Sequence, residues 1–270
     1  MIPKNIIPMI ALAVLTTILF VGCGNSESAR IEIDFSTIAD WKYMLGVDLY
    51  GTPLDRDSEE NFTGSLRAYL RGMPGAGGAG PLTCGFTDVS LSAPFLPEDE
   101  REDIERRLSD LRVSISEKGV TLSDTSGIPG VYAGGWDILR SPARVIPALP
   151  NAVMSVGSSW EREQRFPLHV PQGEADGLMY QLYTLDSLYK TPTGTPVAAI
   201  SWVFTYRVAM SGDGEERGQR RSPLVGQGRG NALLDLRKKK LIQSKATFQV
   251  THSGVRGMEI NEVVHFEMIE

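Results

Sequence analysis

The chain has few of the residues that most often carry out chemistry. Its 270 residues include three histidines and two cysteines, and no histidine lies in an HxxxH spacing or beside a cysteine. This argues against a zinc site built from His and Cys ligands. The sequence also contains no GxSxG elbow and no glycine loop followed by Lys and Ser or Thr. We therefore predict a protein that is not an enzyme and that uses no metal and no cofactor.

Long hydrophobic runs are also scarce, and the clearest one lies at the start of the chain. It follows Lys4, begins near Ile6 and ends at Phe20-Val21-Gly22-Cys23. Its early position and small terminal residues are typical of a secretory signal, and a retained membrane helix is the alternative.

The end of this run resembles the lipobox of bacterial lipoproteins, with Phe20 at the position where leucine is usual. The resemblance implies that residues 1–22 are a signal peptide and that Cys23 is acylated. It also implies a lipid-anchored protein in the cell envelope. Because Gly24 follows the cysteine, it implies the outer membrane, facing the periplasm, if the cell is Gram-negative. Residues 23–33 are then a lipidated tether.

Acylation of Cys23 would leave Cys84 without a partner for a disulfide bond. A free thiol in an oxidising compartment can be reactive, or it can be buried and inert. No histidine near Cys84 in sequence would lower its pKa. We therefore expect a buried, inert thiol.

Alternation of apolar and polar residues with a period of two dominates the rest of the chain. In the clearest case large apolar residues all occupy even-numbered positions: Ile200, Trp202, Phe204, Tyr206, Val208 and Met210. Similar alternation occurs in 43–49, 66–70, 178–182, 248–250 and 264–268. Such a pattern predicts strands with one buried face.

Other local signals predict hairpins and a helix. Hairpins are expected over 113–122 and 233–248, because apolar alternation resumes after a polar turn. Residues 98–111 follow Pro97, begin with acidic residues and set Ile104, Leu108 and Leu111 on one face. This helix could lie on the sheet surface or act as a lid over a cavity. A short helix is also expected around 136–140.

These elements predict a β-dominated α+β fold, in which a curved antiparallel sheet, shaped like a half-barrel or barrel, carries one or two helices. The folded part is expected over 34–270 as a single domain. Two subdomains, 34–126 and 150–270, joined by a segment rich in proline and glycine, are the alternative.

The C-terminal half resembles uncharacterised bacterial lipoprotein families of unknown function. The residues that carry the resemblance are Pro150-Asn151-Ala152-Val153, Val156-Gly157-Ser158-Ser159-Trp160 and the alternating glycines of 226–230 that lead to Asp235. It implies a β-rich envelope domain and brings no catalytic residues. A more distant analogy, in anchoring, length and strand pattern, is to lipoprotein carriers such as LolA, LppX and LprG, in which a curved sheet and helices enclose an apolar cavity.

The alternating aromatic residues are candidates for a binding surface. Trp202, Phe204 and Tyr206 either face an apolar or amphiphilic ligand or belong to the core. Gly226, Gly228 and Gly230 are expected to make room for bulky neighbours across the sheet. The alternating acids Asp55, Asp57 and Glu59 lack the glycine and the glutamate of a calcium loop, so a solvated loop is expected.

Charge is unevenly distributed along the acidic chain, which has a net charge of −6. Residues 215–245 carry nine basic and three acidic residues. They either form solvated loops or present a basic rim to anionic head groups or an acidic partner. The candidates for such contacts are Arg217, Arg220, Arg221, Arg237, Lys238, Lys239 and Lys240.

Two functions therefore remain open. In the first, a lipid-anchored module binds an apolar or amphiphilic ligand. In the second, a structural or interaction lipoprotein with a solid core holds an envelope protein partner. The membrane is a partner in both cases, and nucleic acid is not expected for an exported acidic protein.

Overall fold

The computed structural model of the chain describes the residues 27–34, 42–53, 61–72, 82–94, 96–116, 119–123, 132–133, 136–137, 144–170, 173–210, 224–252 and 258–269. In this part of the chain, eleven strands form one antiparallel sheet in the order β10-β11-β12-β13-β14-β15-β2-β3-β4-β5-β6. The strands of this sheet are β2 (Lys42–Pro53), β3 (Phe62–Gly72), β4 (Leu82–Ser92), β5 (Arg112–Ser116), β6 (Gly119–Ser123), β10 (Ser159–Val170), β11 (Gly173–Lys190), β12 (Pro196–Met210), β13 (Leu224–Asp235), β14 (Lys240–His252) and β15 (Met258–Ile269).

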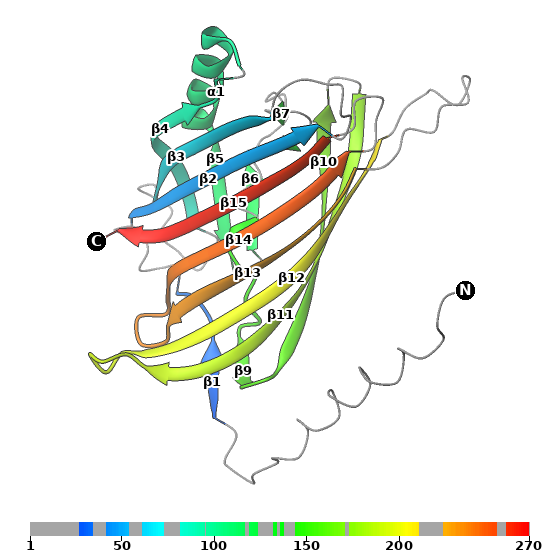
Figure 1. The fold of residues 1–270 in the computed structure, drawn as a ribbon. Coiled ribbons are helices and arrows are strands. Elements are labelled where there is room, and N and C mark those ends of the chain that lie inside the picture. The colour runs from blue at the N-terminus through cyan, green and yellow to red at the C-terminus, as the bar shows by residue number, and fades with distance from the viewer. Residues whose placement is uncertain are drawn as a thin grey trace, which may run out of the picture.

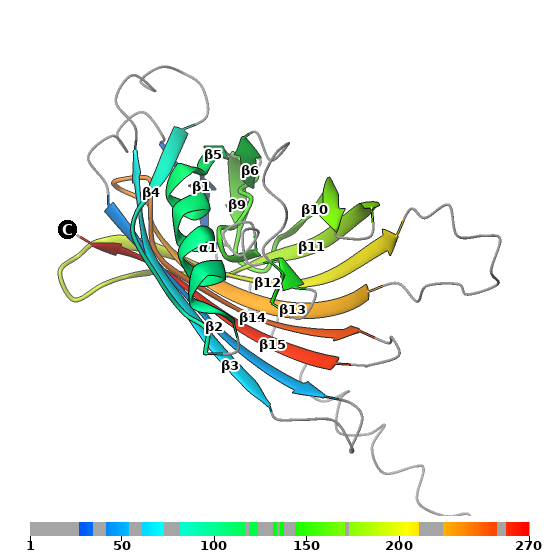
Figure 2. The same cartoon turned by 90° about the horizontal axis from the view of Figure 1, so that it is seen from above.

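The sheet is strongly curved and open, as Figures 1 and 2 show. Its edge strands, β10 and β6, do not pair with one another. The last strand, β15, pairs with β2 over the register Met258↔Pro53 to Ile269↔Lys42, so strands from both halves of the chain belong to the same sheet. The β-dominated fold with a curved antiparallel sheet is thus confirmed. We call the concave face inner and the opposite face outer.

The helix α1 (Glu98–Asp110) lies in the concavity of the sheet (Figure 2). Three acidic residues lie in its first turn, where they interact favourably with the positive end of the helix dipole and stabilise the helix. Ile104 and Leu108 are buried in the core, and the Glu105 carboxylate accepts a hydrogen bond of 2.6 Å from the backbone N–H of Leu91 on β4. The helix is therefore fixed to the sheet by its apolar stripe and by this polar contact.

Two short pairs of strands lie outside the large sheet, and they correct two sequence predictions. β1 (Ser28–Ile31) pairs with β9 (Ala152–Ser155), so the folded part begins inside the expected tether of residues 23–33. β7 (Tyr132–Ala133) pairs with β8 (Trp136–Asp137), so Trp136 begins a strand where a short helix was expected. The β1–β9 pair joins segments that are distant in sequence, and such pairing satisfies backbone groups that no local pattern assigns, whereas β7 and β8 are neighbours in sequence.

Other predicted elements are confirmed. The hairpin β5–β6 pairs Ser116 with Gly119, and the hairpin β13–β14 turns at residues 236–239. The acidic loop around Asp55 lies outside the described residues. None of the described helices is long and apolar enough to cross a membrane.

Cys84 on β4 is a free thiol that is buried in the core. Burial raises its pKa to about 12, so the reactive thiolate is scarce near neutral pH. We expect no reaction of Cys84 with Ellman's reagent at pH 8 in the folded chain and complete reaction in concentrated urea. Fast labelling of the folded chain, mapped to Cys84 by peptide mass spectrometry, would contradict this prediction.

Candidate functional site

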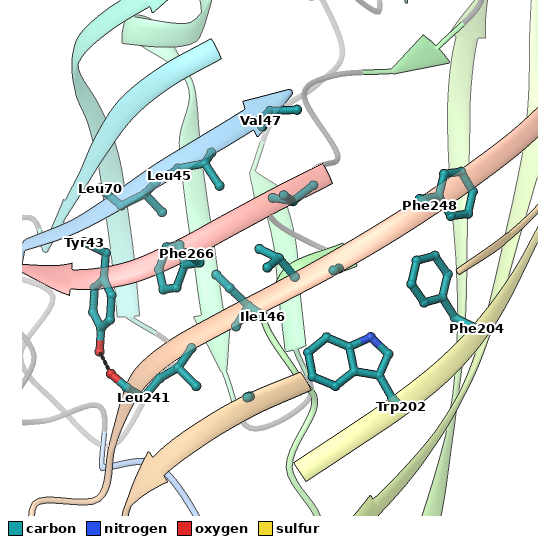
Figure 3. Close-up of a cluster of buried hydrophobic side chains, with 14 of the residues drawn as sticks. Tyr43, Leu45, Val47, Leu70, Ile146, Trp202, Phe204, Leu241, Phe248 and Phe266 are labelled. Atoms are coloured by element: carbon teal, nitrogen blue, oxygen red, sulfur yellow. Dashed lines mark hydrogen bonds between the residues drawn. The ribbon is translucent and has the colours of Figure 1, made fainter. Parts of the chain in front are cut away.

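The aromatic residues that the sequence singles out on β12 point into the core. Trp202, Phe204 and Tyr206 are 2%, 2% and 3% exposed and lie on the inner face. Phe204 stacks on Phe248 of β14 with ring centroids 5.1 Å apart, and Tyr206 meets the same ring edge-on at 5.7 Å. Figure 3 shows Trp202, Phe204 and Phe248 in the cluster of buried side chains. These side chains therefore pack against the protein itself.

The glycines of β13 make this aromatic packing possible. A Cβ atom on Gly230 would lie 2.2 Å from the Trp202 ring, and one on Gly228 would lie 2.4 Å from the Phe204 ring. A Cβ on Gly226 would lie 2.5 Å from the Phe248 ring. The prediction that these glycines admit bulky neighbours is confirmed, because real Cβ atoms do not approach other atoms so closely.

A strap of chain, residues 144–150, crosses the inner face of the sheet. The Ser244 hydroxyl on β14 donates to the carbonyl of Val145. At the other end, the backbone N–H of Ala148 donates to the Tyr183 hydroxyl at 3.2 Å, and the Trp160 indole donates to the Ala148 carbonyl at 2.8 Å. The strap thus spans from β14 to β10 and β11. We call it the inner strap.

The side chains of the inner strap complete the core. Val145, Ile146, Ala148 and Leu149 are all buried, and Figure 3 shows Ile146 among side chains of the sheet. The inner face that a carrier would offer to a ligand is covered here by the chain's own residues. The sequence alone predicts a linker in this segment, because its prolines interrupt every regular period.

A buried ion pair fixes the first residue of the inner strap. Arg144 Nε donates to Glu262 Oε2 at 2.7 Å, and Arg144 Nη2 donates to Glu262 Oε1 at 2.9 Å. Both side chains are at most 1% exposed. The two parallel hydrogen bonds match the planar guanidinium to the planar carboxylate, which is the geometry that makes such pairs strong. Glu262 occupies an inner position of β15, where the alternation alone would predict an apolar residue.

The basic residues proposed for anionic contacts fall into two groups. Arg217, Arg220 and Arg221 lie outside the described residues, as does Cys23. The other four, Arg237, Lys238, Lys239 and Lys240, lie in or beside the turn between β13 and β14.

Asp235 shapes this basic turn. Its carboxylate accepts hydrogen bonds of 2.8 Å from the backbone N–H groups of Arg237 and Lys238. The Lys239 ammonium pairs with Glu32 at 2.6 Å, and together with Arg30 it lowers the pKa of the Glu32 carboxyl. Among the described residues, Arg237 and Lys238 form no ion pair, so their charges are available to a partner.

The outer face of the sheet carries an open groove of about 740 Å3. Two rows of side chains, each running across neighbouring strands in register, form its walls. The first row is Tyr180, Thr205, Gln227, Gln249 and Asn261. The second row is Leu182, Val203, Arg229, Thr247 and Val263. Phe204 and Phe248 also line it, and because their side chains point inward, their backbone forms the floor.

The groove exposes apolar surface. Val203 is 57% exposed, and Tyr180 and Leu182 are exposed beside it. A second hollow of about 580 Å3 continues the groove on the other side of the second row, toward Asn231 and Lys245. The groove thus combines exposed apolar side chains with several polar ones, and its volume lies in the range of sites for small ligands.

Two cationic side chains, Arg229 and Lys245, line the second hollow, and Arg229 also lines the outer groove. Arg229 and Lys245 form no ion pair among the described residues. Three acids near the groove are hydrogen-bonded to neutral neighbours: Asp186 accepts from Ser201 at 2.9 Å, Glu259 accepts from Gln249 and Asn261, and Glu161 on β10, opposite Leu182, bonds with Tyr180. A carboxylate, sulfate or phosphate group would therefore find free cationic partners here.

One histidine borders the second hollow. His265 lies opposite Lys245 in the pairing of β14 with β15. Partial burial lowers the pKa of its imidazole, and the positive charge of Lys245 lowers it further. This lowered pKa favours the neutral imidazole beside Lys245.

The sequence alone does not predict the outer groove. Its basic stretch, residues 215–245, contains Arg229 and Lys245 together with the residues of the turn, and no motif separates them. Arg229 and Lys245 both occupy odd-numbered positions, which alternate with the buried residues of their strands, and this alternation indicates that the two side chains are exposed. It identifies the face of the sheet on which each side chain lies, but not its neighbours on other strands.

The described residues form a curved, open antiparallel sheet with the inner strap on its inner face and a groove, lined by apolar and cationic side chains, on its outer face. Among the described residues, no group of three His, Cys, Asp or Glu side chains could hold a metal ion. No known family model matches the chain, and no curated protein is significantly similar to it in sequence.

Proposed function

We propose that the chain is a lipid-anchored, non-enzymatic protein of the cell envelope that binds an anionic amphiphile in the outer groove. The observation that carries this proposal is that exposed Val203 and Leu182 line the same hollow, the continuation of the groove, as the cations Arg229 and Lys245. Burial of an alkyl chain on the apolar wall contributes about 25 cal/mol per Å2, and the cations select an acidic head group.

The anchor rests on the sequence Phe20-Val21-Gly22-Cys23. It would place the protein at the outer membrane, facing the periplasm, in a Gram-negative cell. We expect the intact mass of the mature protein to show an acylated Cys23, and replacement of Cys23 by serine to abolish both cleavage and membrane retention. A Cys23→Ser chain that is still cleaved and retained would contradict the anchor.

The inner face is the weaker candidate for a ligand. Trp202, Phe204 and Tyr206 are packed against other rings, and the inner strap lies over the same face. A ligand there would have to displace the strap and separate Arg144 from Glu262. The outer groove requires no such rearrangement.

We expect a photoreactive, diazirine-bearing long-chain fatty acid to label the groove in membranes that contain the full chain. Peptide mapping should place the label on the segments around Val203 and Arg229. The double variant Arg229→Gln/Lys245→Gln should reduce labelling about tenfold, because a hydrogen bond to a charged group contributes about 1.5–3 kcal/mol.

Arg207→Gln provides a matched control for this experiment. Arg207 is also exposed on the outer face of β12, but it does not line the groove. This variant should be labelled as strongly as the wild-type chain. Label found on residues of the inner face, or equal labelling of the groove variant and the control, would overturn the proposed site.

The second candidate function is an interaction lipoprotein that holds an envelope protein partner. The inner strap, which covers part of the inner face, and the open shape of the groove favour it. With a photo-crosslinking amino acid at position 203, this function predicts a discrete protein adduct that the Arg229→Gln variant loses and the Arg207→Gln variant keeps. Crosslinks to lipid alone would exclude it.

A further inference from the structure

Exposed apolar side chains lie beside the point where the chain enters the folded domain. The backbone N–H of Val156 donates to the carbonyl of Glu27 at 3.1 Å, and Val153 lies opposite Arg30 in the β1–β9 pair. Val153 is 64% exposed and Val156 is 41% exposed. Neither side chain has a packing role that explains an apolar residue at this position.

Hydrogen bonds connect this point to two neighbouring turns at the same end of the sheet. The N–H of Gly157 donates to the Leu185 carbonyl on β11, and the N–H of Asp34 donates to the Lys239 carbonyl in the β13–β14 turn. Arg237 Nη2 in turn donates to the Gly194 carbonyl at 2.8 Å, which joins this turn to the β11–β12 turn. Figure 1 shows β1, β9 and the β11–β12 turn in the lower part of the molecule.

The β11–β12 and β13–β14 turns add an aromatic residue and cations without ion pairs to the end of the sheet that contains Glu27. Tyr189 is 42% exposed at the end of β11, next to the exposed Lys190. Lys190, Arg237 and Lys238 form no ion pair among the described residues. Four acids lie nearby: Glu32 is neutralised by Lys239 and Arg30, Asp235 is buried beneath the turn, Asp34 lies beside Lys239, and Glu27 is exposed. We call the surface formed by Val153, Val156, Tyr189, Lys190, Arg237 and Lys238 the basal surface.

The length of the tether determines what can cover the basal surface. Glu27 is the fourth residue after Cys23 in sequence. A fully extended chain spans at most about 3.6 Å per residue, so an acylated Cys23 would hold Glu27 within about 14 Å of the lipid head groups. The end of the domain that contains Glu27 must then face the bilayer.

We propose that the basal surface rests on the anionic surface of the bilayer that holds the Cys23 lipid. Val153, Val156 and Tyr189 contact the interfacial region, where aromatic and apolar side chains gain from partial burial. Lys190, Arg237 and Lys238 face the phosphates of anionic lipids, an attraction of about 1 kcal/mol per cation close to the surface. This inference rests on the proposed acylation of Cys23, and it adds a fixed orientation of the domain.

The test uses the acylated full chain in vesicles of phosphatidylethanolamine and phosphatidylglycerol. An environment-sensitive NBD fluorophore is attached to a single introduced cysteine, either Val156→Cys or Tyr189→Cys, while Cys84 stays buried. We expect NBD emission to shift to the blue and to rise about twofold on reconstitution, as it does when a probe enters the interface. Val225→Cys is the matched control, because Val225 is 50% exposed on the outer face of β13.

Charge variants separate the contribution of the cations to membrane contact from that of the apolar side chains. Lys190→Glu/Lys238→Glu should remove most of the NBD response at position 156, and Arg207→Glu should not. An intact mass that shows an unmodified Cys23 would overturn the anchor and this inference together. An acylated chain in which positions 156 and 225 respond equally, or in which neither responds, would overturn the orientation alone.

Discussion

Replacement of Arg144 by methionine is expected to lower the free energy of unfolding by about 3–5 kcal/mol, the largest effect expected from a single side chain in the described part of the protein. Arg144 and Glu262 are joined by two hydrogen bonds in a site that excludes water. The substitution leaves the Glu262 carboxylate buried without its partner, and a buried charge in that state is costly. Urea unfolding of the full chain, followed by circular dichroism, measures the loss.

The double variant Arg144→Met/Glu262→Leu distinguishes a lost ion pair from a damaged core. It removes both charges and keeps similar side-chain volumes, so we expect it to recover most of the stability that Arg144→Met loses. If the double variant is as unstable as the sum of the two single variants, the ion pair is not the cause. Arg144→Lys keeps the charge and serves as a milder variant, should Arg144→Met fail to fold.

Replacement of Gly230 by alanine is the second change for which we expect a large effect, about 3 kcal/mol of destabilisation. Its Cβ would lie 2.2 Å from the buried Trp202 ring, and the ring atoms are its three nearest neighbours. The indole has to move within a close-packed core, where even a small displacement disturbs the packing of neighbouring side chains. Thermal and urea unfolding should both report the loss.

A double-mutant cycle tests this cause. In a Trp202→Phe background the closest ring atoms are absent, so Gly230→Ala should cost less than about 1 kcal/mol there. Gly46→Ala is a matched control in β2, because its Cβ would lie 3.3 Å from the end of the flexible Arg67 side chain. An equal cost of Gly230→Ala in both backgrounds, or an equal cost of Gly46→Ala, would refute the proposed clash.

The strands and the helix could be predicted from the sequence because each produces a periodic pattern within its own residues. A strand with one buried face alternates every second residue, as β12 does from Ile200 to Val208. The stripe of α1 and its acidic first turn are likewise local. The glycines of β13 were interpretable because their spacing matches the aromatic residues of the neighbouring strand.

The candidate site could be predicted only in part. The sequence indicated a cationic stretch, but it did not separate Arg229 on the outer face from Arg237 in a turn. It also offered Trp202, Phe204 and Tyr206 as either ligand contacts or core, and their burial places them in the core. Alternation shows that one face of a strand is apolar, but it does not show whether a ligand or the chain itself covers that face.

The sequence by itself determined the β-dominated fold class, the helix, the hairpins and the glycine positions, because burial of one face imposes a period on adjacent residues. Tertiary structure alone decided the inner strap, the ion pair and the outer groove. Arg144 and Glu262 are 118 residues apart, and the rows of the groove exist only when five strands lie in register. Such contacts are set by the packing of distant segments, and no local period of the sequence encodes them.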